Sequence, residues 1–129
     1  MKCKNIERKV IIIKTKLIVK KKGMYLCIDL NNVLYFENCL RKIIVYFNDK
    51  KTQWFYGKFS ELLNLLGEET FFVQTHRSFI VNINFISCVY TDNIRFDRCE
   101  KKTAPLSKKY FSNLISILTK ITDEKIIIS

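Results

Sequence analysis

Residues that interrupt regular structure are scarce in this chain. Only 3 glycines and 1 proline occur among its 129 residues, and no repeat or low-complexity stretch is present. Because flexible linkers are rich in glycine, serine or proline, this composition leaves little room for a linker between domains. With 48% hydrophobic and 27% charged residues, the sequence predicts a single globular domain that buries a core of its own.

Acidic side chains are scarce as well. Asp and Glu number 12 against 23 Lys and Arg, which gives a formal net charge of +11. Such an excess favours a polyanionic partner, which is a nucleic acid, an anionic membrane surface or an acidic protein. A lysine-rich surface that only keeps the protein in solution is the alternative interpretation.

The sequence lacks the patterns of disulfide frameworks, metal sites and catalytic sites. The cysteines are odd in number and none stands in Cys-x-x-Cys spacing, which predicts neither zinc binding nor a disulfide framework. We interpret them as buried or half-buried free thiols in a reducing compartment. The single histidine and the absence of a glycine-rich phosphate loop argue against an enzyme and predict no cofactor and no metal. The cysteines are Cys3, Cys27, Cys39, Cys88 and Cys99.

No hydrophobic run reaches the length of about 18 residues that a membrane-spanning helix needs. Near the N-terminus, the apolar run from Val10 to Ile13 is too short for the core of a signal peptide, and lysines follow it. We therefore expect a cytoplasmic protein that does not associate with a membrane.

Short stretches of β-branched and aromatic residues dominate the rest of the chain. The helical patterns are few: an apolar stripe from Phe59 to Leu66, with Ser60 as its N-cap and Gly67 as its C′ residue, and a last helix capped by Ser107. These helices do not alternate with the strands, so we expect a mostly β, antiparallel fold rather than parallel βαβ units. The expected strands cover residues 10–20, 24–30, 33–36, 43–47, 52–56, 71–73, 79–81, 85–90 and 94–98, with a turn at 100–102.

The stretch from Phe71 to Asn82, FFVQTHRSFIVN, places a polar bend between two apolar strand segments. His76 stands in that bend beside Arg77, and a polar tip on a rigid mount suits contact with another molecule. For His76, a structural hydrogen bond across the bend and a contact to a phosphate or base are both open. Ser78 and Asn82 are expected to stabilise the turn.

Lys108 and Lys109 stand at the predicted start of the last helix. The helix macrodipole disfavours cations there by ~0.3–1 kcal/mol each, and a phosphate partner would offset that cost. Screening by solvent is the alternative. We expect the lysines at 20–22 and 50–51 to be solvated turn charges, and Trp54 and Tyr56 to lie mostly in the core.

Several of these segments resemble the LytTR family of DNA-binding domains. The resemblance covers residues 14–116 and rests on the order and spacing of its motifs. It implies an elongated antiparallel β-sheet domain of bacterial transcription regulators, with a short mid-chain helix and a C-terminal helix, whose loops enter the major groove of duplex DNA. The motifs are GMYLCIDLNNVLYFEN at 23–38, WFYGKFSELLNLL at 54–66, HRSFIVN at 76–82 and PLSKKY at 105–110.

The resemblance also implies the residues of a DNA-binding site: Arg77 with His76 beside it, Lys108 with its neighbour Lys109, and Lys42 in the loop that follows the Glu-containing strand. Many family members have arginine where this chain has Lys108 and Lys109. Lysine lacks the two-pronged contact that arginine makes to guanine, so we expect weaker base selectivity there. The match of Lys42 needs a gap, and the glycine usual before the Pro-x-Ser segment is missing.

The domain organisation implied by this resemblance is an N-terminal arm or edge element at residues 1–13, the LytTR-like domain at 14–118 and a tail at 119–129. Most members carry an N-terminal receiver or membrane domain, for which residues 1–13 are too few. Because one domain offers a small reading surface, we expect two copies on repeat half-sites of double-stranded DNA, and a monomer or weak dimer in free solution.

Two other functions are compatible with a basic, aromatic, β-rich chain. One is a single-stranded nucleic-acid-binding β-barrel of the OB type. The other is an adaptor that binds an acidic protein or a membrane through its basic surface. Competition between duplex and single-stranded DNA separates the first from a duplex reader, and the adaptor predicts no DNA binding at moderate salt.

Overall fold

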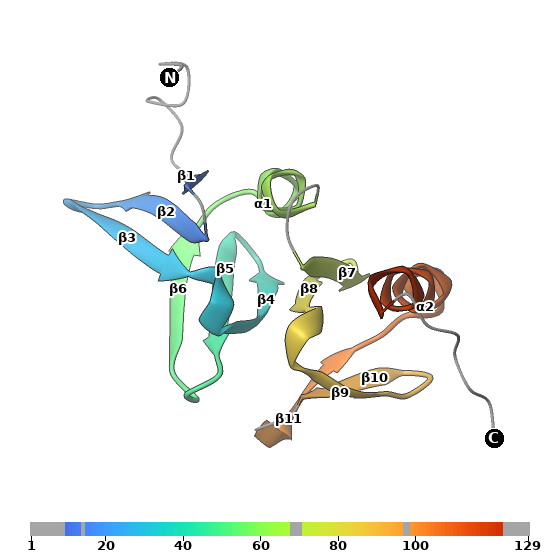
Figure 1. Ribbon diagram of the computed structural model, residues 1–129. Helices are drawn as coiled ribbons and strands as arrows, with labels where there is room; N and C mark the ends of the chain where they lie inside the picture. Colours follow the sequence, from blue (N-terminus) through green and yellow to red (C-terminus); the bar gives the residue numbers. More distant parts are fainter. Residues whose placement is uncertain (1–9, 14, 68–70, 97–98, 123–129) are drawn as a thin grey trace.

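The computed structural model of the protein describes residues 10–13, 15–67, 71–96 and 99–122. Short strands dominate, α1 lies in mid-chain and α2 comes last (Figure 1), which confirms the predicted mostly β fold class. Single 3-10 turns, Leu30–Asn32 and Ile83–Phe85, precede β4 and β9. The elements are β1 (Val10–Ile13), β2 (Lys16–Lys21), β3 (Met24–Asp29), β4 (Val33–Cys39), β5 (Lys42–Phe47), β6 (Thr52–Tyr56), α1 (Phe59–Leu66), β7 (Phe72–His76), β8 (Phe79–Asn82), β9 (Ile86–Val89), β10 (Asn93–Phe96), β11 (Cys99–Pro105) and α2 (Lys108–Thr122).

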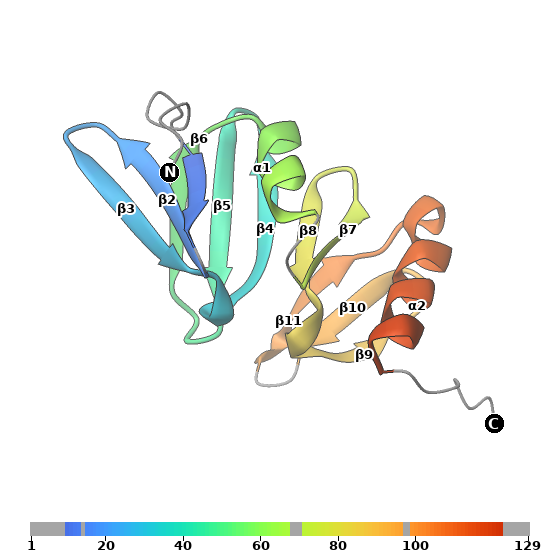
Figure 2. The same cartoon turned by 45° about the horizontal axis from the view of Figure 1, so that its top comes forward.

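The strands form three antiparallel sheets. A five-stranded sheet of order β6-β5-β4-β8-β7 lies between two three-stranded sheets, β1-β2-β3 and β11-β10-β9. Figure 2 shows the N-terminal sheet toward one end of the molecule, α1 over the middle, and the C-terminal sheet with α2 toward the other end. The elongated shape follows from this succession of sheets.

The five-stranded sheet carries a hydrophobic core on each of its faces. Phe36 on β4 packs in the first core with Leu17 of β2 and Leu62 of α1. Tyr35, its neighbour on the same strand, packs in the second core with Leu114 of α2. Because successive side chains of a strand point to opposite faces, one central strand holds both halves of the molecule together. The turns at the ends of this sheet are therefore mounted on a rigid support.

Two predicted boundaries in the strands are wrong. The predicted strand at 10–20 is a hairpin, since the chain turns at Thr15 and pairs Ile13 with Lys16. β propensity is high on both sides of this turn, and propensity does not distinguish one long strand from two paired short ones. The predicted turn at 100–102 lies inside β11. That strand is at the edge of its sheet, where charged residues are well tolerated.

The predicted ends of α1 are also wrong. The helix begins at Phe59, and Lys58 in the capping position makes no side-chain hydrogen bond to it, so Ser60 is not the N-cap. Phe59 packs against the first core, so the helix already begins before Ser60. Gly67 has a φ of −70°, so it is not the left-handed C′ residue expected there. For α2 the boundary is confirmed, because the helix starts directly after Ser107.

The cysteines whose side chains the structure describes are free but not buried. Cys27, Cys39 and Cys88 are free thiols as expected, but all three are exposed, so their predicted burial is wrong. They lie on outward strand faces or at a strand end, where no second layer covers them.

The predicted arm at residues 1–9 and the apolar tail at 126–128 lie outside the described residues. The proposed limit at residue 118 falls within α2, and the division of the chain stays a prediction.

Within the described ranges, neither helix combines the length and the apolar character that crossing a lipid bilayer requires.

Candidate nucleic-acid interface

Several connections of the chain lie on one side of the molecule, the upper side in Figure 2. They are the β2–β3, β4–β5 and β7–β8 turns, the link from β6 to α1, and the start of α2. β4 and β8 are antiparallel neighbours, with Glu37 opposite Phe79. The backbone N–H of Asn38 donates a hydrogen bond to the carbonyl oxygen of Ser78 over 2.8 Å. This bond ties the β4–β5 turn to the β7–β8 turn.

The start of α2 is attached to the same place. The backbone N–H of Ser107 donates to the carbonyl oxygen of Thr75 over 3.0 Å. Leu114, further along the same helix, is wholly buried in the second core. The hydrogen bond and the packing together place Lys108 and Lys109 next to the bend that carries His76.

Exposed basic side chains gather on these joined segments, and we call this surface the basic edge. The link after β6 belongs to it, because the N–H of Gly57 donates to the carbonyl oxygen of Arg41 over 3.3 Å. The exposed acidic residues in the flanking segments are Glu61 and Asp92, so positive charge prevails and attracts polyanions. The residues of the basic edge are Arg41, Lys42, Lys58, Arg77, Lys108 and Lys109.

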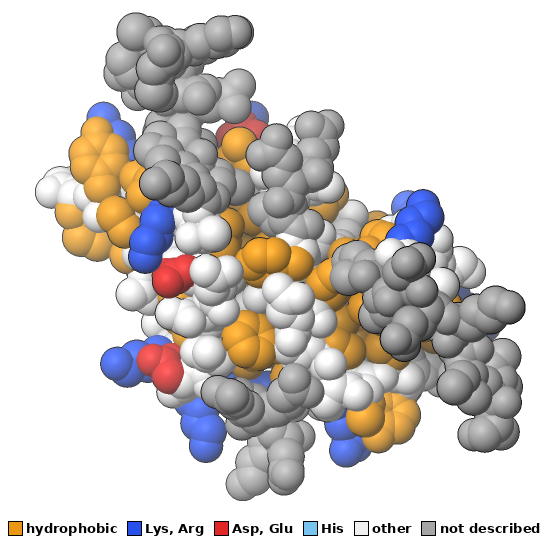
Figure 3. All heavy atoms as spheres, viewed as in Figure 1, with side chains coloured by type: hydrophobic (Ala, Val, Ile, Leu, Met, Phe, Trp, Pro, Cys, Tyr) orange, Lys and Arg blue, Asp and Glu red, His pale blue; other side chains and the backbone are white. Residues whose placement is uncertain are grey.

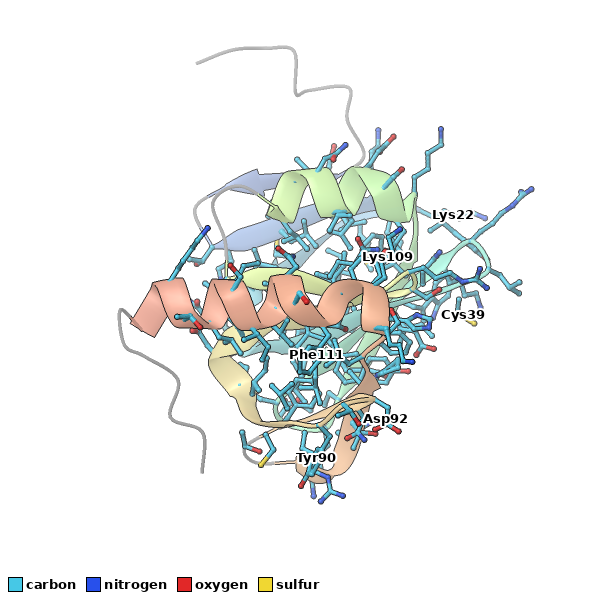
Figure 4. All side chains as sticks on the ribbon, turned by 90° about the vertical axis from the view of Figure 1, so that its right-hand side faces the viewer. Lys22, Cys39, Tyr90, Asp92, Lys109 and Phe111 are labelled. Atoms are coloured by element: carbon cyan, nitrogen blue, oxygen red, sulfur yellow. The ribbon has the colours of Figure 1, made fainter. Side chains whose placement is uncertain are left out.

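The basic edge differs from the face seen in Figure 3. On that face hydrophobic and uncharged side chains fill the centre, and the Lys and Arg side chains lie scattered toward the margin. In Figure 4, by contrast, Cys39 beside the β4–β5 turn, Lys109 of α2 and Lys22 of the β2–β3 turn lie toward the same side of the molecule. A ligand that follows the positive charge would meet the turns first.

A β-bulge shapes the bend between β7 and β8. The register of the two strands shifts between Gln74 and His76, which leaves Thr75 as the extra residue. Thr75 is wholly buried and its hydroxyl has no hydrogen-bond partner among the described residues, while its carbonyl oxygen accepts from Ser107. Bulges bend a strand and redirect its side chains. Here the bulge directs the chain into the bend just before Arg77.

His76 and Arg77 are held in different ways. The Nδ1 atom of His76 accepts a hydrogen bond from the N–H of Ser78 over 3.1 Å, and its ring stands edge-on to Phe79 with the centroids 5.6 Å apart. The structural hydrogen bond that was one of its two interpretations is therefore present. Arg77 is exposed, and no hydrogen bond or ion pair ties its guanidinium to another described residue. Its donors are free to meet a ligand.

Lys42 is the predicted site residue that lies at the β4–β5 turn. It opens β5, and its Nζ atom stands 4.5 Å from the centroid of the Trp54 ring on β6. The turn before it consists of Leu40 and Arg41, between the paired residues Cys39 and Lys42. The sequence did not point to Arg41, or to Lys58 after β6. Only the strand register shows that both belong to the basic edge, although the polar run at residues 37–42 was a signal for a turn.

The sequence predicted that Trp54 and Tyr56 lie mostly in the core. This prediction is wrong, because the two residues are 37% and 64% exposed. Both lie on β6, which is an edge strand of the five-stranded sheet. The Nζ atom of Lys21 stands 3.9 Å from the centroid of the Trp54 ring and donates to the Trp54 carbonyl oxygen over 2.8 Å. Lys21, expected to be a solvated turn charge, is therefore held on the tryptophan together with Lys42.

One acidic side chain within the strands near the bend is already engaged. The Tyr46 hydroxyl donates to Oε1 of Glu37 over 2.7 Å. Burial and then this hydrogen bond to a carboxylate raise the pKa of Tyr46 well above its usual value, because both favour the neutral phenol. The phenol therefore keeps its proton at neutral pH and donates it to Oε1 of Glu37.

Fold and surface together define a class of protein: a small antiparallel β module that presents basic side chains from joined turns. A family model described as the LytTr DNA-binding domain matches residues 23–119. The chain belongs to the LytTR family. LytTR domains are DNA-binding domains of the response-regulator type in bacterial transcription regulators.

A solved structure with the same fold agrees with this assignment. It is the LytTr DNA-binding domain of a protein described as a methyl-accepting/DNA response regulator from Bacillus cereus. The two chains are 25% identical, and the match covers 82% of this chain and 98% of that chain with a TM-score of 0.64. No curated protein matches this chain.

Proposed function

We propose that this chain is a transcription regulator that binds duplex DNA sequence-specifically and reads the major groove with the turns of the basic edge. The observation that carries the proposal is the joining of three basic segments by two backbone hydrogen bonds, Asn38 to Ser78 over 2.8 Å and Ser107 to Thr75 over 3.0 Å. Side chains on turns that a rigid sheet supports can enter a groove without a recognition helix. A DNA-binding role also accounts for the cytoplasmic location expected from the sequence.

The basic residues divide by the contacts that their chemistry allows. Arg77 carries a planar fork of donors, which matches the O6 and N7 acceptors of guanine in the major groove. Lys108 and Lys109 are point charges on flexible stems, better suited to phosphates, and the helix N-terminus beneath them also favours an anion. Lys42 and Arg41 extend the same surface through the β4–β5 turn. His76 maintains the bend and is also proposed as a DNA contact.

Selection of bound duplexes from a random pool tests this proposal. The expected result is the enrichment of a defined motif, because Arg77 and its neighbours read bases and not only phosphates. If no motif is enriched although DNA is retained, the protein binds without sequence preference. We also propose two copies on repeat half-sites, because one domain has a small reading surface. The mass of the complex with a selected duplex gives the copy number.

The alternative nucleic-acid partner is a single strand stacked on exposed aromatic residues. Trp54 and Tyr56 are the observation in its favour, since base stacking on aromatic rings is how such proteins hold their ligands. However, the Trp54 ring is already covered by the ammonium groups of Lys21 and Lys42. Competition with single-stranded DNA of the same length is expected to displace little of a selected duplex.

Replacing Lys108 by alanine is expected to weaken binding to selected and scrambled duplexes by a similar factor. If about 5 phosphates are neutralised, a plot of log K against log salt has a slope near −4 to −5, and losing one phosphate contact makes it shallower by about one unit. Lys50→Ala is the matched control, because Lys50 lies in the β5–β6 turn at the opposite end of the sheet. A Lys108→Ala slope equal to that of Lys50→Ala would remove Lys108 from the interface.

A further inference from the structure

Leu40 stands at the apex of the β4–β5 turn and combines two features that are unfavourable for a protein without a bound partner. Its side chain is 93% exposed, the largest fraction among the exposed large hydrophobic residues of the described chain. Its backbone has a φ of 59°, in the left-handed region that glycine and asparagine tolerate and leucine rarely adopts. A glycine or asparagine would relieve the strain and remove the apolar surface together. Strain of this kind often marks a functional contact.

The surroundings of Leu40 indicate what it contacts. Arg41 follows it directly, and the bond from Asn38 to Ser78 fixes the turn beside Arg77. A ligand that meets this edge is a polyanion, yet a leucine side chain gains nothing from a phosphate. The major groove of duplex DNA presents one apolar group, the 5-methyl group of thymine, and apolar side chains read it by contact.

We propose that Leu40 contacts the 5-methyl group of a thymine in the major groove and gives the β4–β5 turn its base selectivity. The inference rests on the proposed function, because the turn has to enter the groove. It adds a different kind of reading to that function: Arg77 recognises a guanine by hydrogen bonds, and Leu40 recognises a neighbouring thymine by its methyl group. The hairpin holds the leucine at the apex, so the contact needs no rearrangement of the turn.

The test removes the methyl group and nothing else. Each thymine of a selected duplex is replaced in turn by deoxyuridine, and the full chain is titrated with every duplex. At one position the wild-type protein is expected to bind the uracil duplex about fourfold more weakly, the factor that corresponds to one buried methyl group. Leu40→Asn is expected to bind the thymine and uracil duplexes equally, and to be at least as stable as the wild type because asparagine tolerates a positive φ.

The control is a second residue with the same backbone conformation. Lys50, in the β5–β6 turn at the other end of the sheet, has a φ of 72°, and Lys50→Asn is expected to keep the wild-type preference for the methyl group. The proposal is overturned if no uracil duplex binds more weakly than its thymine parent, or if Leu40→Asn retains the preference. If the wild type binds no duplex at all, the proposed function has failed and the proposal fails with it.

Discussion

Arg77→Ala is expected to lower the affinity for a selected duplex by about 1–3 kcal/mol, roughly 5- to 150-fold, and to leave binding to a scrambled duplex almost unchanged. The reason is that a guanidinium donates to two acceptors of one guanine, and alanine leaves both acceptors without a partner. Binding to random sequence depends mainly on phosphate contacts, which other residues of the basic edge supply. Titration of both duplexes across a salt series measures the two losses separately.

A matched arginine lies elsewhere on the surface. Arg95 on β10 is also exposed, and its guanidinium carbon stands 5.0 Å from the centroid of the Tyr90 ring. Arg95→Ala removes the same charge away from the basic edge, so it is expected to affect neither duplex by more than the general loss of one charge. Both variants should unfold at the wild-type temperature, since both side chains are exposed. Equal losses on the two duplexes for Arg77→Ala, or its unfolding, would show Arg77 to be structural.

The second large effect is expected in stability. Asn82 is wholly buried at the end of β8, where its Nδ2 donates to the carbonyl oxygen of Val33 over 2.8 Å and its Oδ1 accepts from the N–H of Asn84 over 2.9 Å. Asn82→Ala leaves a buried carbonyl without a donor and uncaps the 3-10 turn. We expect a loss of about 2–3 kcal/mol in the free energy of unfolding. Urea denaturation should show a lower midpoint with an unchanged slope.

Asp29 offers the control for this variant, because it caps the other 3-10 turn in the same way. Its carboxylate accepts from the N–H of Asn31 over 3.1 Å, but in an exposed position. Asp29→Ala therefore removes a cap without leaving a buried polar group, and is expected to cost no more than about 1 kcal/mol. If the two variants lose the same stability, the burial of Asn82 is not what makes it important.

Local patterns predicted most elements of the fold but not their assembly. Alternating β-branched residues indicated the strands, and the apolar stripe from Phe59 to Leu66 indicated α1. The hairpin at Thr15 and the strand over residues 100–102 were missed, because charged residues are compatible with both a turn and an edge strand. The exposure of Trp54 was missed for a related reason, since composition does not reveal which strand lies at the edge of a sheet.

For the candidate site, too, the sequence indicated most of the residues but not how they come together. The bend at His76 and Arg77 and the lysines at the start of α2 stood out in the sequence, and the structure brings these segments together. Their joining depends on the hydrogen bond between Ser107 and Thr75, which links residues far apart in the chain. Arg41 entered the site only through strand register. The contacts of these residues with DNA stay predictions.

The position of the DNA on the protein tests the central claim most directly. Backbone amide signals of the chain can be followed by NMR while a selected duplex is added. We expect the largest shifts at residues 40–42, 76–78 and 107–109, and little change at residues 48–51, which form the β5–β6 turn at the opposite end of the sheet. Shifts centred on that turn or on the face shown in Figure 3, with the basic edge unchanged, would contradict it.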